Sequence, residues 1–208
     1  MLLIGLTGNY GMGKSSVLPM FQRLGALTLD TDKIVKSLLR EKPVLNKIKG
    51  LFGNDIFNKN GSLNKKKVSH VIFQNDRLRR SLEDILHPLV FEKIHLFLSK
   101  SKCQDKIIII EVPLLFEGGY ENSFDKIITI FSQEEKALNR LKKKGIKPLE
   151  AVQRLKYQLP IEEKIRRADF IIDNNMTIDQ TRRQVKIIHK KLVEKEKDGD
   201  NNRPRNLQ

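Results

Sequence analysis

The sequence contains little cysteine, no tryptophan and few aromatic residues. Its single cysteine, Cys103, excludes an internal disulfide and any metal site with two cysteine ligands, and its polar neighbours indicate an ordinary surface thiol. Aromatic residues make up 6% of the chain, with three Tyr and no Trp. The basic segments are therefore not interleaved with aromatic side chains, which argues against a nucleic-acid-binding surface that stacks bases on aromatic rings.

Long apolar runs are also missing. The longest fall far short of the ~20 residues that a membrane-spanning helix needs. The first four residues, MLLI, have no basic segment before them and are soon followed by Gly8 and Lys14, unlike a secretion signal. We therefore expect a cytoplasmic protein with no membrane partner.

Acidic residues are scarce relative to basic ones. The chain has 25 Asp and Glu against 40 Lys and Arg, so its formal net charge is +15. An excess of this size suits a polyanionic partner, such as nucleic acid, acidic lipid or phosphorylated metabolites. It is also what a genome biased towards Lys, Ile and Asn produces. The length of 208 residues, 39% of them apolar, fits one domain with an elaboration or two small domains.

Short apolar runs alternate with helical patterns along the chain. Strands are predicted at residues 2–6, 26–29, 107–110, 127–131 and 170–172. The four consecutive isoleucines at 107–110 are typical of a parallel strand that is covered on both faces. This alternation indicates an α/β domain with a mainly parallel sheet.

Residues 33–100 carry mostly helical patterns. Pro43 is expected to open one helix and Pro88 another, and Asn60-Gly61 predicts a turn between them. The block is too long for a simple crossover between strands. We therefore predict an inserted helical subdomain.

Helices are also predicted at 14–24, with Pro19 inside, and in the C-terminal third. Ser132 and Glu135 have capping-box spacing, which predicts a helix from there to Gly145. Further helices are expected to open at Pro148 and to follow residue 172. From about Lys190 the chain is mixed in charge with Gly, Asn and Pro, so we expect the tail to fray.

The most informative segment runs from Gly8 to Ser15 and reads GNYGMGKS, which fits the P-loop pattern. Its glycines let the backbone wrap around phosphate oxygens, and the following helix N-terminus adds partial positive charge. Lys14 is expected to reach the β- and γ-phosphates of ATP, and the Ser15 hydroxyl to bind Mg²⁺. The predicted strand before the motif and helix after it are the context that the motif requires.

A P-loop predicts that the protein binds a nucleotide, but it does not identify the reaction. An Asn-Lys-x-Asp motif for guanine is not found in the sequence, which argues against a GTPase switch. A kinase needs an acceptor site and a lid, and the helical block at 33–100 and the basic segment at 140–167 can supply them.

An ordered set of residues indicates which family of proteins the chain resembles. Its members are residues 4–8, 11–16, 24–26, 30–32, 86–88 and 113–117, with Phe21, Arg140, Leu141, Arg154, Gln158, Ala168, Asp169 and Asn174. In this order and spacing, over about residues 2–190, the chain resembles the dephospho-CoA kinase family. The Pro-Leu-Leu-Phe-Glu segment at 113–117, with His87-Pro88 upstream, is far more specific for this family than the P-loop is.

The resemblance implies an ATP-dependent, Mg²⁺-requiring enzyme that phosphorylates the 3′-hydroxyl of dephospho-CoA to give coenzyme A. It implies a fold like that of nucleoside monophosphate kinases, with a five-stranded parallel sheet. The P-loop core is expected at 1–32, 101–139 and 166–190. A helical CoA- and acceptor-binding domain is expected at 33–100, a lid at 140–165, and a disordered tail at 191–208.

The resemblance also assigns roles to individual residues. Asp32, Lys14 and Arg140 are expected to be catalytic, and Ser15 to hold the metal. The remaining assignments are as follows: Gly11, Met12, Gly13, Lys14, Ser15 and Ser16 for ATP; His87, Pro113, Leu114, Leu115 and Glu117 for the acceptor; Arg140, Lys144, Arg154 and Gln158 for the lid; Asn174 for adenine.

Several positions depart from the family pattern. Asn9, Tyr10 and Met12 stand where the family usually has small residues and Ile, and we expect tolerance because these positions are read mostly through the backbone. Lys144 stands where Arg is common, which keeps the charge but loses bidentate geometry. Met176 replaces a small residue after Asn174, which weakens the adenine assignment.

Three assignments have a structural alternative. His87 either contributes to the acceptor site or is only a histidine at a helix boundary. Asp32 either accepts the proton of the attacking hydroxyl or caps the helix expected from Lys33. Glu117 either closes the acceptor site or caps a local turn. Lys142 and Lys143 are interpreted as a solvated helix face, and Glu111 is left without a role.

Two other functions stay open at this stage. One is a small-molecule kinase of the same fold, of the nucleoside monophosphate kinase type. The other is a nucleic-acid-binding ATPase or a nucleotide switch, suggested by the net charge. The oligomeric state does not follow from the sequence.

Overall fold

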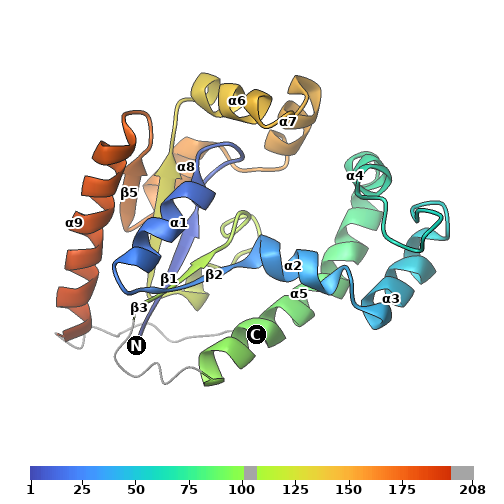
Figure 1. The fold of residues 1–208 in the computed structure, drawn as a ribbon, viewed down its shortest axis with the longest axis horizontal. Coiled ribbons are helices and arrows are strands. Elements are labelled where there is room, and N and C mark those ends of the chain that lie inside the picture. The colour runs from blue at the N-terminus through green and yellow to red at the C-terminus, as the bar shows by residue number, and fades with distance from the viewer. Residues whose placement is uncertain (101–106, 198–208) are drawn as a thin grey trace. The chain divides into compact units, whose positions relative to one another are not determined.

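The computed structural model describes residues 1–100 and 107–197 (Figure 1). Cys103 therefore lies outside the described residues. The elements, in chain order, are β1 (Leu2–Thr7), α1 (Lys14–Arg23), β2 (Leu27–Asp30), α2 (Thr31–Leu38), α3 (Lys42–Phe52), α4 (Lys65–Gln74), α5 (Asp76–Lys100), β3 (Ile107–Glu111), the 3₁₀ turn η1 (Glu121–Ser123), β4 (Lys126–Phe131), α6 (Glu134–Lys143), α7 (Pro148–Leu155), α8 (Ile161–Arg167), β5 (Phe170–Asp173) and α9 (Ile178–Lys197).

The described strands form a five-stranded sheet in the order β2-β3-β1-β4-β5, and every pairing is parallel. Parallel strands require crossover connections, and α1 forms the first of them, from β1 to β2, which lies on the far side of β3. The predicted α/β class and the five-stranded parallel sheet are confirmed. In this order β1 is central, so the loop that follows it lies at the middle of the carboxyl edge, where open α/β sheets bind ligands.

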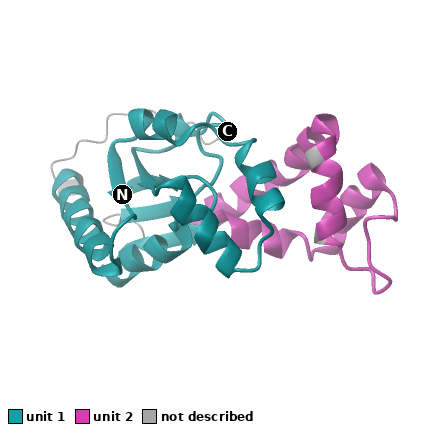
Figure 2. Cartoon of the chain, turned by 90° about the horizontal axis from the view of Figure 1, so that it is seen from above, with its two compact units in different colours: residues 1–30, 103–208 teal, residues 31–102 magenta. Residues whose placement is uncertain are grey.

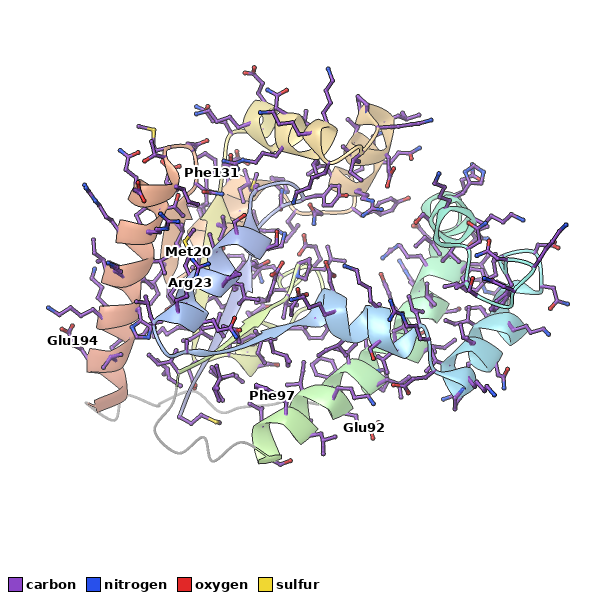
Figure 3. All side chains as sticks on the ribbon, in the orientation of Figure 1. Met20, Arg23, Glu92, Phe97, Phe131 and Glu194 are labelled. Atoms are coloured by element: carbon purple, nitrogen blue, oxygen red, sulfur yellow. The ribbon has the colours of Figure 1, made fainter. Side chains whose placement is uncertain are left out.

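Alternate residues of the strands face two different layers. Leu2, Ile4 and Leu6 belong to a core cluster with α1 and α9, which includes Met20 and Phe21 of α1 and Val185, Ile188 and Leu192 of α9 (Met20 is labelled in Figure 3). On the other face a Cβ at Gly5 would lie 2.5 Å from Leu115 Cδ1, so the segment after β3 packs directly against β1. Helix α8 contacts β4. The sheet is thus buried on both faces, as its apolar strands predict.

The chain divides into two compact units, coloured separately in Figure 2. One comprises residues 1–30 and the described part of 103–208, and the other the described part of 31–102. The second unit has its own core, in which α2, α3 and α4 all contact α5. Its buried members are Leu38, Val44, Ile48, Ile56, Val68, Leu82 and Leu86. The predicted turn at Asn60-Gly61 is present between Phe57 and Leu63, which pair as an isolated bridge.

The prediction that Pro88 starts a helix is wrong. Pro88 lies inside α5, which runs without interruption from Asp76 to Lys100. A proline in a helix interior removes one backbone hydrogen bond. The apolar stripe of Leu82, Leu86, Val90 and Ile94 keeps four-residue spacing on both sides of it, so packing along one face holds the helix together. Pro43, by contrast, stands in the first turn of α3 as predicted.

The C-terminal part also needs correction. Residues 191–197, which were assigned to a disordered tail, continue α9, and Leu192 is fully buried in the core. The cause is the stripe of Val185, Ile188 and Leu192, which keeps this helix packed on α1 and lets it continue about two turns beyond the expected end. The rest of the tail, from 198, lies outside the described residues. No helix among the described residues has the length and apolarity that spanning a membrane requires.

The capping box predicted at Ser132 and Glu135 is not formed, although α6 does begin at Glu134. The N-cap is Gln133, and its side chain makes no capping hydrogen bond. Ser132 is buried, and its hydroxyl accepts a hydrogen bond from Arg140 Nη1 at 3.1 Å. The Gln133 N–H instead donates to Asn175 Oδ1 at 2.7 Å. The turn after β5 therefore takes the place of the local cap.

Candidate active site

The P-loop connects β1 to α1 and contains the backbone geometry that phosphate binding needs. Gly13, at the N-cap of α1, has a φ of 103°, in the left-handed region that favours glycine. A Cβ at this position would lie 2.1 Å from Asn174 Nδ2, so a side chain is excluded by contact as well as by conformation. Gly8, at the other end of the loop, has a φ of 144°, and a Cβ there would lie 2.5 Å from Ile130 O. Both ends of the loop thus require glycine.

Lys14 is buried at the first position of α1, as expected for a P-loop lysine. Its Nζ donates to Gly8 O at 2.7 Å and to Asn9 O at 3.3 Å, so the loop's own carbonyls hold the ammonium. Ser15 and Ser16 follow in the first turn of the helix, and both side chains are exposed. A helix N-terminus, a lysine and two hydroxyls at the centre of the carboxyl edge form a site suited to a polyphosphate.

A group of hydrogen bonds holds the P-loop from outside. Asn174 Nδ2 donates to Met12 O at 2.9 Å, and Asn174 Oδ1 accepts from Thr181 Oγ1 at 3.0 Å. Asn174 follows β5, and its own N–H donates to Phe131 O at the end of β4 (Phe131 is labelled in Figure 3). Its side chain is buried and bonded at both polar atoms, so it supports the P-loop, and its assignment to adenine stays a prediction.

Arg140, on α6, completes this support. Its Nη2 donates to Asn174 O at 2.6 Å, and its Nη1 contacts Met12 O at 3.5 Å as well as Ser132 Oγ. The guanidinium thus joins the P-loop to the ends of β4 and β5. Sequence reasoning placed Arg140 in the lid; the structure brings it to the base of the P-loop. Lys144 lies at the exposed C-terminal end of the same helix.

The segment that follows α7, residues 158–160, lies against the P-loop; we call it the lid root. The Tyr10 N–H donates to Gln158 Oε1 at 2.8 Å, and Asn9 Nδ2 donates to Leu159 O at 3.0 Å. The Arg154 guanidinium lies 4.9 Å from the centre of the Tyr10 ring, within cation–π range. The side chains of Asn9 and Tyr10 therefore make contacts of their own within the chain, and the tolerance expected at these two positions stays a prediction.

The loop after β3, residues 113–117, also contacts this region. Pro113 O accepts a hydrogen bond from Thr7 Oγ1, at the end of β1, at 3.3 Å. Leu114 is exposed, whereas Leu115 is fully buried against Gly5 and has no surface for a ligand. Assigning Leu115 to acceptor binding was therefore wrong, because its side chain anchors the loop in the core.

Glu117 does not act as a local turn cap. Its Oε1 accepts from the Leu159 N–H at 2.8 Å and pairs with Lys164 Nζ at 2.8 Å. Lys164, on α8, also donates to Pro113 O at 3.2 Å and is fully buried. Burial lowers the pKa of the Lys164 ammonium from its ordinary value, an effect that the Glu117 carboxylate partly opposes. Sequence reasoning missed Lys164, since it stands among exposed charges in the segment EEKIRR.

Asp32 and His87 belong to the second unit. β2 ends at Asp30, which is in register with Glu111 of β3, and Glu111 is in register with Leu6 of β1. Asp32 therefore follows, by two residues, a strand that ends at the same edge as the P-loop. It is exposed in the first turn of α2, which begins at Thr31, so it is not the residue that caps this helix. His87 is exposed on α5.

The order of the sheet, the P-loop after its central strand and the helical unit inserted after β2 are those of a P-loop kinase. Solved structures share this fold. A Thermus thermophilus protein aligns with a TM-score of 0.80 at 27% identity, covering 92% of this chain and 97% of that one. The fold is also that of a shikimate kinase from Acinetobacter baumannii, with a TM-score of 0.51 at 16% identity, covering 93% and 94% of the two chains.

The chain belongs to the dephospho-CoA kinase family, whose sequence model it matches over residues 2–180. It is 37% identical to the dephospho-CoA kinase of Aquifex aeolicus, covering 91% of this chain and 97% of that one. The dephospho-CoA kinase of Fusobacterium nucleatum is likewise 37% identical, with coverages of 88% and 95%. The solved dephospho-CoA kinase of Campylobacter jejuni aligns with a TM-score of 0.66 at 27% identity, covering 92% and 97%. The resemblance drawn from the sequence is confirmed.

Proposed function

We propose that this protein is a dephospho-CoA kinase, which transfers the γ-phosphate of ATP to the 3′-hydroxyl of dephospho-CoA. The observation that carries the proposal is the family match, which spans the sheet, the inserted unit and the lid segment around an intact P-loop. The high net charge fits both substrates, since each carries several phosphates. The cytoplasmic location expected from the sequence stays a prediction.

The chain's own residues supply binding, orientation and charge for this reaction. Lys14 and the N-terminus of α1 neutralise the charge that develops on the transferred phosphoryl group. The 3′-hydroxyl oxygen attacks the γ-phosphorus, and the bond to the β–γ bridging oxygen breaks. The proton of the hydroxyl passes to the carboxylate of Asp32, and ADP leaves with the electron pair of the broken bond. Atoms and charge balance without a further reactant.

The site also fits the Mg²⁺ that accompanies ATP in P-loop kinases. Ser15 lies exposed in the first turn of α1, directly after the buried Lys14, as a hydroxyl ligand of a hard cation requires. When bound, Mg²⁺ neutralises charge on the β- and γ-phosphate oxygens.

A panel of acceptors tests the proposed substrate. With ATP as donor, kcat/KM is expected to be highest for dephospho-CoA among dephospho-CoA, AMP, CMP and UMP, measured as ADP formed. Coenzyme A itself, whose 3′-position is already phosphorylated, is the matched control and should not be phosphorylated. If AMP, CMP or UMP has a higher kcat/KM than dephospho-CoA, the chain is instead a kinase of the nucleoside monophosphate type.

We further propose that the segment between Arg140 and Gln158 is a mobile lid, which these two residues hold at its ends and whose other cations close over the phosphates and exclude water. Its support is the position of Gln158 and Arg154 against Tyr10 of the P-loop. Amide hydrogen exchange at 144–157 is expected to slow when ATP and acceptor bind together. Exchange in the buried part of α9, around Val185 and Leu192, serves as the internal control and should stay unchanged. Equal exchange at 144–157 with and without ligands would instead indicate a static helix pair.

A further inference from the structure

Lys164 is a charged side chain that has no role in the proposed chemistry of the P-loop or in the contacts of the lid. It lies on α8, with no exposed surface, between the sheet and the loop after β3. Removing an ammonium from water is costly, and the residue can be tolerated there only because its hydrogen bonds are supplied. Glu117 Oε1, at 2.8 Å, and Pro113 O, at 3.2 Å, supply them.

These two partners connect Lys164 to the segments that form the site. Glu117 Oε1 also accepts from the N–H of Leu159, whose carbonyl in turn accepts from Asn9 of the P-loop. Pro113 O also accepts from Thr7, the last residue of β1 before the P-loop. One ammonium thus lies where the loop 113–117, the lid root and the end of the central strand meet.

Stability alone is a poor explanation for this arrangement. Replacing a buried ion pair with apolar residues of similar volume is often neutral or stabilising, so the presence of the pair is weak evidence for a role in stability. A charged hydrogen bond does supply a fixed direction and distance. The main effect of the pair is therefore to fix the relative position of the segments that it joins.

We propose that Lys164 is a positioning residue for phosphoryl transfer, which holds Glu117 and Pro113 so that the loop 113–117 and the lid root keep a fixed position beside the P-loop. It touches neither substrate. The inference rests on the proposed function only in that the reaction used to measure it is the phosphorylation of dephospho-CoA.

The test is Lys164→Met, a change that keeps the length of the side chain and removes the ammonium. Measured well below the Tm of the variant, kcat/KM for dephospho-CoA is expected to fall roughly 10- to 10²-fold, the scale of a displaced but intact site. The Kd for ATP alone should change less than about 3-fold, because Asn174 and Arg140 hold the P-loop independently of Lys164. The amide of Leu159 should exchange faster without ligand.

Arg166→Met is the matched control. It removes one cation from the same helix, at an exposed position where Arg166 pairs with Glu163. Its kcat/KM, ATP affinity and Leu159 exchange should equal those of the wild type. If Lys164→Met is also folded and equal to the wild type in all three measurements, the proposal is overturned.

A second variant keeps the test valid if Lys164→Met does not fold. Removing one partner of a buried pair leaves an uncompensated charge, and Glu117→Gln in the same chain removes that charge. The double variant should recover its Tm but not its kcat/KM. Recovery of both would mean that Lys164 only balances the charge of Glu117, and would overturn the positioning role.

An error in the proposed function would be detected separately from an error in this proposal. In that case the wild-type enzyme would not phosphorylate dephospho-CoA, which is measured before any variant is made. The variants would then be compared with the acceptor that the wild type does use. The ATP affinity and the exchange of the Leu159 amide need no acceptor.

Discussion

Lys14→Ala is expected to lower kcat by roughly 10²- to 10³-fold, the loss typical of removing a fixed donor from a developing negative charge. The ammonium is held in the loop by the carbonyls of Gly8 and Asn9. Lys14 is thus positioned at the P-loop, where the phosphates of ATP are expected to bind. The alanine variant keeps the left-handed Gly13 and the helix N-terminus, so weakened ATP binding should remain measurable.

The measurement is single-turnover phosphoryl transfer together with ATP binding by calorimetry. Lys186→Ala is the control, because it removes the same charge from an exposed position on α9. Thermal unfolding checks that both variants are folded. Near-normal turnover in Lys14→Ala would be incompatible with the assignment of the P-loop as the ATP site.

The P-loop could be predicted from the sequence because its requirements are local. Gly8, Gly13 and Lys14 are needed for the conformation and chemistry of one short segment, so their spacing is sufficient to identify it. The strands were predictable for a related reason: continuous runs of Ile and Leu have few places other than a sheet that is covered on both faces. The family resemblance added the inserted unit, which no local rule connects to the P-loop.

The roles of Asn174, Arg140 and Lys164 could not be predicted from local sequence. Asn174 bonds Met12, which is 162 residues away, and Glu117 bonds Leu159, which is 42 residues away. Such pairs exist only after the sheet has brought the ends of its strands together. Lys164 also stands in a charged segment whose pattern indicates a solvated helix, and its burial depends on how α8 packs against β4.

The errors at Pro88 and at the end of α9 share one cause. Both predictions treated residues that are unfavourable in a helix, a proline and a stretch of mixed charges, as boundaries. In α5 and α9 the apolar stripe continues past these residues, and tertiary packing stabilises a helix more than local propensity does. Sequence signals for helix ends are reliable only where the apolar stripe ends as well.

Asp32 is the remaining assignment with a large expected effect, as the base that accepts the proton of the attacking hydroxyl. Its support is positional. β2 ends at Asp30 on the carboxyl edge of the sheet, where ligands of open α/β folds bind, and Asp32 follows in the exposed first turn of α2. The competing role as a helix cap is weakened, because α2 already begins at Thr31. A carboxylate in the first turn still interacts favourably with the helix dipole, by about 0.3–1 kcal/mol.

The two roles separate in Asp32→Asn, which keeps the shape of the side chain and removes both its charge and its basicity. The lost dipole interaction should lower the free energy of unfolding by less than about 1 kcal/mol, whereas the loss of a general base should slow kcat by roughly 10²- to 10⁴-fold. Asp30→Asn is the matched control, because it removes the same charge from the last residue of β2, outside α2. It should lose much less turnover. Chemical denaturation and kcat, measured on the same preparations, decide between the roles. A folded Asp32→Asn enzyme with wild-type kcat would leave Asp32 with its effect on the helix alone, since an amide cannot take the proton that the reaction releases.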